Sequence, residues 1–189
     1  MGTVFQDYDN DGRPDIIVTV LPRQLYSVFH NDGGGVFTYE SLETGLGSLT
    51  PGSSGWVVGL EDFDNDGYPD LFVASYGKNI LYHNNGDGTF TDVTAKAGVA
   101  GGGWSGSAGF FDYNNDGHLD LFVTRYMEWD ADHNKICGGS WKTYCPPGEF
   151  PGTTCLLYRN RGDGTFEDVS ERSGIAAEKG RALGVAFAD

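Results

Sequence analysis

The chain has 189 residues, an apolar fraction of 39% and a formal net charge of −15, with 27 acidic and 12 basic side chains. This charge repels phosphate backbones and anionic lipids, which argues against nucleic acid and membrane surfaces as partners. No apolar run approaches the roughly 18 residues of a spanning helix, so membrane insertion is not expected. Thirty glycines and 12 phenylalanines predict short strands, tight turns and a packed core.

The first repeated element is an acidic phrase, which occurs as DYDNDGRPD, DFDNDGYPD and DYNNDGHLD. Each copy follows a short apolar stretch and precedes an alternating one, such as LDLFV. A second phrase comes next, as LYHNNGDGTFTDV and LYRNRGDGTFEDV, with a looser first copy VFHNDGGGVFTYE. The acidic phrases lie 55 and then 50 residues apart, a period that accommodates several short strands in each unit.

Each unit is predicted to contain four strands. One strand enters the acidic loop, a second leaves it, and two more are joined by a turn such as NGDG, which favours tight hairpins. The units are about 1–50, 51–100 and 101–180, and residues 181–189 would begin a fourth. The expected fold is all-β, a partial β-propeller of four-stranded antiparallel blades. A single helical turn is expected at VTAKAGV and at VSERSGI.

The acidic loops carry oxygen side chains at positions 1, 3, 5 and 9, and glycine at position 6. Calcium takes six to eight oxygen ligands, and alternate residues of a tight loop turn their oxygens inward. The predicted ligand side chains are Asp7, Asp9, Asp11 and Asp15 in the first loop, Asp62, Asp64, Asp66 and Asp70 in the second, and Asp112, Asn114, Asp116 and Asp120 in the third. Backbone carbonyls at position 7 would come from Arg13, Tyr68 and His118.

About three structural Ca²⁺ ions are therefore expected. The alternatives are plain turns stabilised by Asp and Asn, a magnesium site, and a helical calcium motif of the EF-hand kind. The helical motif is rejected because the residues after each loop alternate with the period of a strand.

The phrases GFFDYNNDGHLDLFVTRY and LYRNRGDGTFEDVSERSGI resemble the FG-GAP or VCBS repeat of integrin-α-like β-propellers. More narrowly, they resemble the ASPIC/UnbV-associated bacterial proteins related to cartilage acidic protein. The resemblance covers practically the whole chain. It implies a propeller whose loops between the first two strands of each blade bind calcium, in an extracellular, periplasmic or cell-surface protein. It also implies binding or adhesion more often than catalysis.

Such propellers usually have about seven blades, so the chain is expected to be a fragment of a longer protein whose beginning, with any signal peptide, is missing. Its open edges would then meet the remaining blades, or associate edge to edge with another copy.

The third unit contains an insertion, at 128–154, with the sequence EWDADHNKICGGSWKTYCPPGEFPGTT. Long loops in compact folds are often functional. The insertion contains four aromatic residues, Trp129, Trp141, Tyr144 and Phe150, and it is expected to pack over a propeller face.

All three cysteines lie in or beside this insertion. The resemblance implies a disulfide between Cys137 and Cys145, with Cys155 as a free thiol. Three reduced cysteines, or a zinc site that also uses His133, are the alternatives; the usual CxxC spacing of zinc sites is missing.

No motif of a nucleophilic enzyme such as GxSxG is present. His30 and His133 are predicted to lie on turns. His83 aligns with Arg159, and neither it nor His118 is expected to be essential. The sequence therefore predicts an extracytoplasmic, calcium-binding scaffold for binding or adhesion, whose ligand, a protein or a carbohydrate, it does not identify. The alternative is an accessory or catalytic domain of a secreted enzyme or biosynthetic protein.

Overall fold

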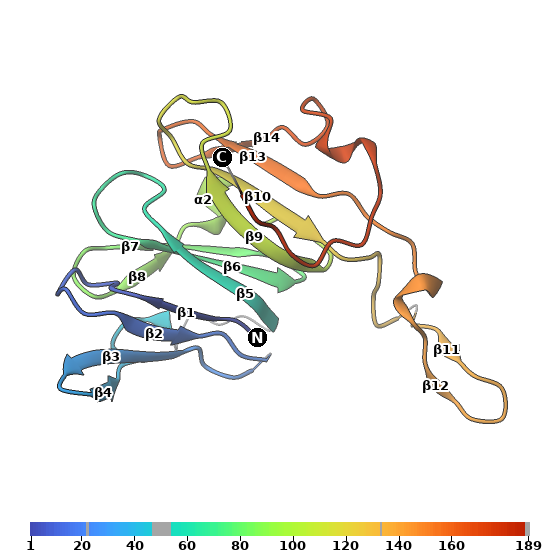
Figure 1. Ribbon diagram of the computed structural model, residues 1–189, viewed down its shortest axis with the longest axis horizontal. Helices are drawn as coiled ribbons and strands as arrows, with labels where there is room; N and C mark the ends of the chain where they lie inside the picture. The colour runs from blue at the N-terminus through green and yellow to red at the C-terminus, as the bar shows by residue number, and fades with distance from the viewer. Residues whose placement is uncertain (22, 47–53, 133, 188–189) are drawn as a thin grey trace.

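The computed structural model describes residues 1–21, 23–46, 54–132 and 134–187. Its main body consists of three four-stranded antiparallel sheets, each a meander in chain order (Figure 1). The first sheet contains β1 (Thr3–Gln6), β2 (Asp15–Val18), β3 (Ser27–Gly33) and β4 (Val36–Tyr39). The second contains β5 (Ser54–Glu61), β6 (Asp70–Tyr76), β7 (Ile80–Asn84) and β8 (Phe90–Asp92). The third contains β9 (Ser105–Phe111), β10 (Asp120–Arg125), β13 (Leu156–Asn160) and β14 (Phe166–Asp168).

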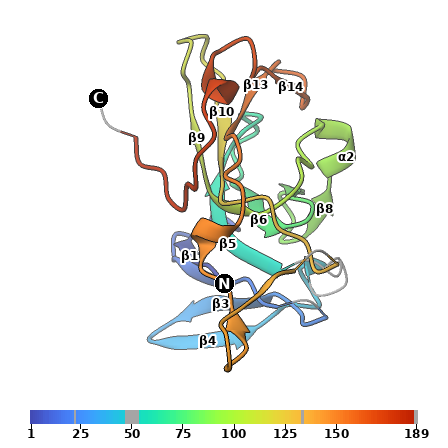
Figure 2. The same ribbon diagram turned by 90° about the vertical axis from the view of Figure 1, so that its right-hand side faces the viewer.

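The three sheets follow one another as successive blades, and β5 lies between β1 and β9 (Figure 2). This arrangement confirms the prediction of an all-β, partial β-propeller. The acidic loops join the first two strands of each blade, at the same end of all three sheets.

Strand β6 shows why its sequence is almost continuously apolar. Successive side chains of a strand point to opposite faces, and both faces of this sheet are covered. Leu71 and Val73 belong to the core shared with the first blade. Phe72 and Ala74 belong to the core shared with the third. The hydrophobic core of the molecule is therefore two layers between blades.

In the described residues, helical structure is confined to short turns. Helix α2 (Thr94–Ala97) follows β8, as expected, and ends at Gly98, whose φ of 78° suits a residue without a side chain. The 3₁₀ turns are η1 (Pro147–Glu149) and η2 (Ile175–Ala177). Within the described ranges, no helix is long and apolar enough to span a membrane.

The insertion forms a small hairpin of β11 (Ile136–Cys137) and β12 (Thr143–Tyr144), which projects away from the blades (Figure 1). The disulfide between Cys137 and Cys145 is present, which excludes both sulfurs as zinc-binding thiolates, and Cys155 is free. His133 lies outside the described residues.

The expectation that the whole insertion packs over a propeller face is wrong for its tip. Trp141 and Tyr144 are each 86% exposed, whereas Phe150 is buried. Trp129 packs against Tyr76, with ring centroids 5.3 Å apart. The two limbs of the insertion, which contain Trp129 and Phe150, are therefore packed, whereas its tip is not. Strands of two residues are too short to cover a sheet.

The expected first strand of a fourth blade is not formed over residues 181–187. This segment lies beside β9: the ring of Phe187 stacks on Phe111 at 4.4 Å, and Ala182 N donates to Arg125 O at 3.1 Å. Gly109 leaves room for the Phe187 ring, which a Cβ at that position would meet. A strand requires a regular ladder of backbone hydrogen bonds with a neighbour. This segment is held by the bond from Ala182 and by the apolar contacts of Phe187. Asp189 lies outside the described residues.

Candidate metal-binding loops

The carboxylate at position 1 holds each acidic loop closed. In the second loop, Asp62 accepts hydrogen bonds from the backbone N–H of Asp66 at 3.0 Å and of Gly67 at 2.9 Å. Asp7 and Asp112 accept the same pair in the other two loops. The loops therefore share one backbone conformation, as their common spacing predicts.

Asparagine at position 4 contributes to this conformation and was not singled out from the sequence. Asn10, Asn65 and Asn115 all have φ near 60°, in the left-handed region that asparagine tolerates better than most side chains. Glycine follows two positions later, also with positive φ. The recurring NDG triplet is the sequence signal for these two residues with positive φ in each loop.

The carboxylate at position 9 is buried in every loop. Asp70 is fully buried, and it accepts hydrogen bonds from Phe63 N at 3.3 Å and from Asn84 N at 2.8 Å. Asp15 and Asp120 make the equivalent pair of contacts. Each of these carboxylates connects the start of its loop to the third strand of the blade.

Burial raises the pKa of Asp70 to about 7, and it also raises the pKa of Asp15 and of Asp120. Burial disfavours the charged form of a carboxyl group, and a nearby cation favours it. These side chains are therefore placed where a divalent cation would stabilise their ionised form.

Two sets of carboxylate oxygens converge closely enough to share one ion. In the first loop they belong to Asp7, Asp9 and Asp15, and in the second to Asp62, Asp64 and Asp70. Within each set the oxygens lie within 4.8 Å of one another. Oxygens that share a Ca²⁺ at about 2.3–2.6 Å are at most about 4.6–5.2 Å apart. The donor atoms and their spacing thus fit the ion implied by the loop sequence.

Two histidines lie beside these loops. His30 lies in β3 and not on the predicted turn, and His83, which was not expected to be essential, lies in β7. His83 Nδ1 is 3.3 Å from Asp64 Oδ2 and 3.1 Å from Asp70 Oδ1. His30 Nδ1 is 3.3 Å from oxygens of both Asp9 and Asp15. Each histidine also forms a compact group with the carboxylates at positions 3 and 5 of its loop.

The third loop differs from the first two in charge. Arg159 occupies the place of the two histidines, and its Nη2 lies 3.1 Å from Asp116 Oδ2. Asn114 replaces one carboxylate. In the portions of the chain that the structure describes, no compact group of acidic and histidine side chains forms here. This loop therefore has one negative charge fewer and a fixed cation of its own.

The first loop also contacts an arginine, since the guanidinium of Arg13 binds Asp11. In the second loop position 7 is Tyr68, which brings no charge and packs close to Gly86. Among the three loops the second therefore combines four carboxylates with no arginine contact in the described residues.

The loops also form the contact between neighbouring blades. The side-chain Nδ2 of Asn84 donates to Tyr8 O in the first loop at 2.7 Å, and that of Asn160 donates to Phe63 O in the second loop at 2.8 Å. The ring of Tyr8 packs on Phe90 of the next blade at 5.9 Å. Each of the first two loops is thus held by the blade that follows it.

The repeated units match a known family. The model of the FG-GAP-like repeat family matches residues 7–73 and 62–123, together well over half of the chain. No curated protein matches. A lectin from Agrocybe aegerita, solved for its specific recognition of non-reducing terminal N-acetylglucosamine, is 20% identical, with a TM-score of 0.46. That similarity covers 87% of this chain and 50% of the lectin, so the chain spans half the length of that protein. The narrower resemblance to ASPIC/UnbV-associated proteins stays a prediction, and the chain belongs to the FG-GAP-like repeat family.

Proposed function

We propose that this chain is a calcium-binding repeat module that serves as a scaffold for binding or adhesion outside the cytoplasm. The observation that carries the proposal is the convergence of buried and exposed carboxylates in loops that also form the contact between blades. A bound ion would offset the repulsion among these carboxylates and the desolvation of the buried one. Its role would be to hold the blades together.

The first two loops are the principal sites in this proposal. The side chains that would hold the ions are Asp7, Asp9, Asp11 and Asp15, and Asp62, Asp64, Asp66 and Asp70. Calcium is favoured over zinc because the donors are mainly carboxylate oxygens, which suit hard cations. The histidines are close enough to add a nitrogen ligand for a softer ion, so a competing metal belongs in any titration.

The third loop would bind calcium more weakly than the other two. It has one carboxylate fewer, because Asn114 stands at position 3, and Arg159 places a positive charge on Asp116. Arg13 places a similar charge on Asp11, but the first loop keeps all four carboxylates. About three sites were expected from the sequence; we propose two stronger sites and a weaker third.

Two features support an extracytoplasmic, non-catalytic role. The Cys137–Cys145 disulfide is typical of oxidising compartments, where calcium is also plentiful. The conspicuous carboxylates are engaged in closing the loops, and the family is one of repeat modules. We therefore propose that the loops shape and stabilise a binding surface instead of catalysing a reaction.

The test is thermal unfolding during a calcium titration, with Asp66→Asn as the variant and Asp87→Asn as its control. Asp87 is an exposed turn residue outside the acidic loops, so both variants remove one negative charge. A ligand that binds only the folded chain stabilises it by about 2.7 kcal/mol at a 100-fold excess over Kd. We expect this gain in the wild type and the control and a clear reduction in Asp66→Asn. Equal gains in both variants would contradict the proposal.

A further inference from the structure

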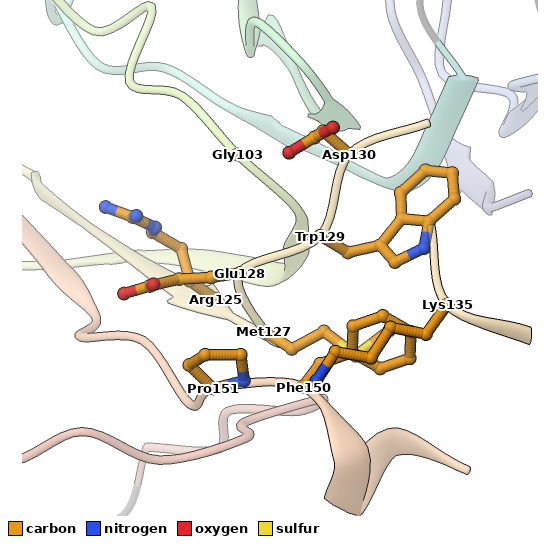
Figure 3. Close-up of a pocket in the computed structure, with 9 residues that line it drawn as sticks. All are labelled: Gly103, Arg125, Met127, Glu128, Trp129, Asp130, Lys135, Phe150 and Pro151. Atoms are coloured by element: carbon orange, nitrogen blue, oxygen red, sulfur yellow. The ribbon is translucent and has the colours of Figure 1, made fainter. Parts of the chain in front are cut away.

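A cavity of about 500 Å³ lies at the end of the third blade opposite the acidic loops, where the chain leaves β10 and enters the insertion (Figure 3). This volume is in the range of small-molecule sites. In Figure 3, Arg125 and Glu128 lie on one side and Trp129 on the other, with Met127 and Phe150 below them. The cavity shares no residue with the proposed calcium sites.

Trp129 is held firmly in place. Its ring packs on Tyr76 at 5.3 Å and on Trp104 at 5.8 Å, and its Nε1 donates to Asn134 Oδ1 at 3.0 Å. Trp104 is itself surrounded by aromatic rings, Trp56 and Tyr126 among them. A ring fixed before binding loses little conformational entropy when a ligand stacks on it.

The floor of the cavity is formed by Met127 and Phe150, which are apolar and packed against the blade. Met127 and Phe150 are each 7% exposed. The two limbs of the insertion are joined by a hydrogen bond from Glu128 N to Pro151 O at 2.9 Å. Lys135 crosses the Phe150 ring, and its Nζ donates to Glu149 O at 2.8 Å. The cavity is therefore a built feature and not a gap between loosely attached loops.

The charges around the cavity are balanced, although the chain as a whole is strongly acidic. Two acidic side chains, Glu128 and Asp130, and two basic ones, Arg125 and Lys135, line the same space. Lys179 lowers the pKa of Glu128 through a hydrogen bond of 2.9 Å, so this carboxylate is ionised at neutral pH. Acceptors and donors are both present among the lining residues, whose formal charges cancel.

This combination restricts the ligand. A purely apolar molecule would desolvate four charged groups without replacing their hydrogen bonds, which is unfavourable. A charged ligand would meet one pair of like charges. A sugar ring is neutral, offers a face of C–H groups to an indole, and carries hydroxyls that both donate and accept.

A second cavity, of about 210 Å³, extends the site toward the hairpin. It shares Met127, Trp129 and Phe150 with the first, and it is also lined by Tyr144 and Cys145 of the hairpin. The disulfide hairpin thus lines the second of two adjoining cavities, which together are called the groove here. We infer that this groove binds a neutral oligosaccharide, with Trp129 as the stacking platform and the four charged side chains as hydrogen-bonding partners.

The experiment is a screen of neutral di- to hexasaccharides of several linkages, followed by calorimetry with the best of them. Trp129→Ala should weaken binding at least about tenfold through loss of the stacked ring. Trp129→Phe keeps a ring and the fold and should retain part of the affinity. The matched control is Trp141→Ala, which removes a tryptophan from the exposed tip of the same insertion.

Three results would overturn the inference. They are no binding of any neutral oligosaccharide at millimolar concentration, equal affinity in Trp129→Ala and the wild type, and preference for sulfated over neutral sugars. Repeating the calorimetry with Asp66→Asn separates this inference from the proposed calcium function. Sugar binding that persists in that variant supports a groove independent of the loops. Sugar binding that is lost there but survives in Trp129→Ala would place the sugar elsewhere.

Discussion

The side-chain amide of Asn160 donates to the backbone carbonyl of Phe63, which lies 97 positions earlier in the chain. The same Nδ2 donates to Leu119 O within its own blade at 3.0 Å; the contact with Phe63 is buried and that with Leu119 is partly buried. Asn84 makes the equivalent pair with Tyr8 O and Pro69 O. One buried amide therefore joins the acidic loop of one blade to the third strand of the next.

Replacement of Asn160 by alanine should destabilise the whole domain. The carbonyls of Phe63 and Leu119 would be left without this donor, and an unsatisfied buried group typically costs about 1–3 kcal/mol. We expect the free energy of unfolding in urea to fall by roughly 2–4 kcal/mol.

Asn31→Ala is the matched control for this change. Asn31 stands at the same register in the first blade, and its Oδ1 accepts from Gly33 N just as that of Asn160 accepts from Gly162 N. In the described part of the chain its Nδ2 donates to Pro14 O alone. Equal destabilisation by the two substitutions would show that the contact between blades contributes little.

The third loop should gain calcium affinity when Arg159 is replaced by histidine. Histidine is the residue of the first two blades at this position, and it removes the fixed charge that now contacts Asp116. We expect the weakest site seen by calorimetry to tighten by roughly tenfold, about 1.4 kcal/mol.

Arg161→His provides the charge-matched comparison, because Arg161 lies two residues farther along and, among the described residues, makes no hydrogen bond or ion pair with the acidic loop. If both substitutions tighten the weakest site equally, general charge and not the Asp116 contact controls its affinity.

The repeat and the loop were predictable because they depend on local sequence. DFDNDGYPD specifies its own turn, and the alternation in LDLFV specifies a strand. His83 and Arg159 were not recognised because they reach the loops through the pairing of the second and third strands. That pairing places Leu71 opposite Tyr82 and Leu121 opposite Tyr158, one residue before each side chain concerned. Strand register is a tertiary property, which the spacing of an isolated phrase does not contain.

Loss of the disulfide should loosen the hairpin without unfolding the blades. The bond closes a span of only eight residues, and the hairpin tip lies outside both cores. In the double variant Cys137→Ser, Cys145→Ser we expect a small change in melting temperature and faster trypsin cleavage after the exposed Lys142.

Cys155→Ser is the control, because it removes a free thiol outside the hairpin. A large fall in melting temperature of the double variant, with unchanged cleavage at Lys142, would mean that the hairpin supports the blades.

Calcium binding and blade contact should be thermodynamically coupled. Asn160 holds Phe63 O, which belongs to the second acidic loop, so its removal frees the backbone beside the ligands Asp62 and Asp64. Coupling between two sites is reciprocal, and typical values correspond to about 5–150-fold in affinity. In Asn160→Ala we therefore expect the tightest calcium site to weaken by at least about fivefold. The side-chain Nδ2 of Asn31 contacts only its own blade among the described residues. Asn31→Ala should therefore leave the affinity of the tightest site unchanged. Calorimetric titration of both variants decides the matter: an unaltered tight site in Asn160→Ala would mean that the loop binds its ion without help from the neighbouring blade.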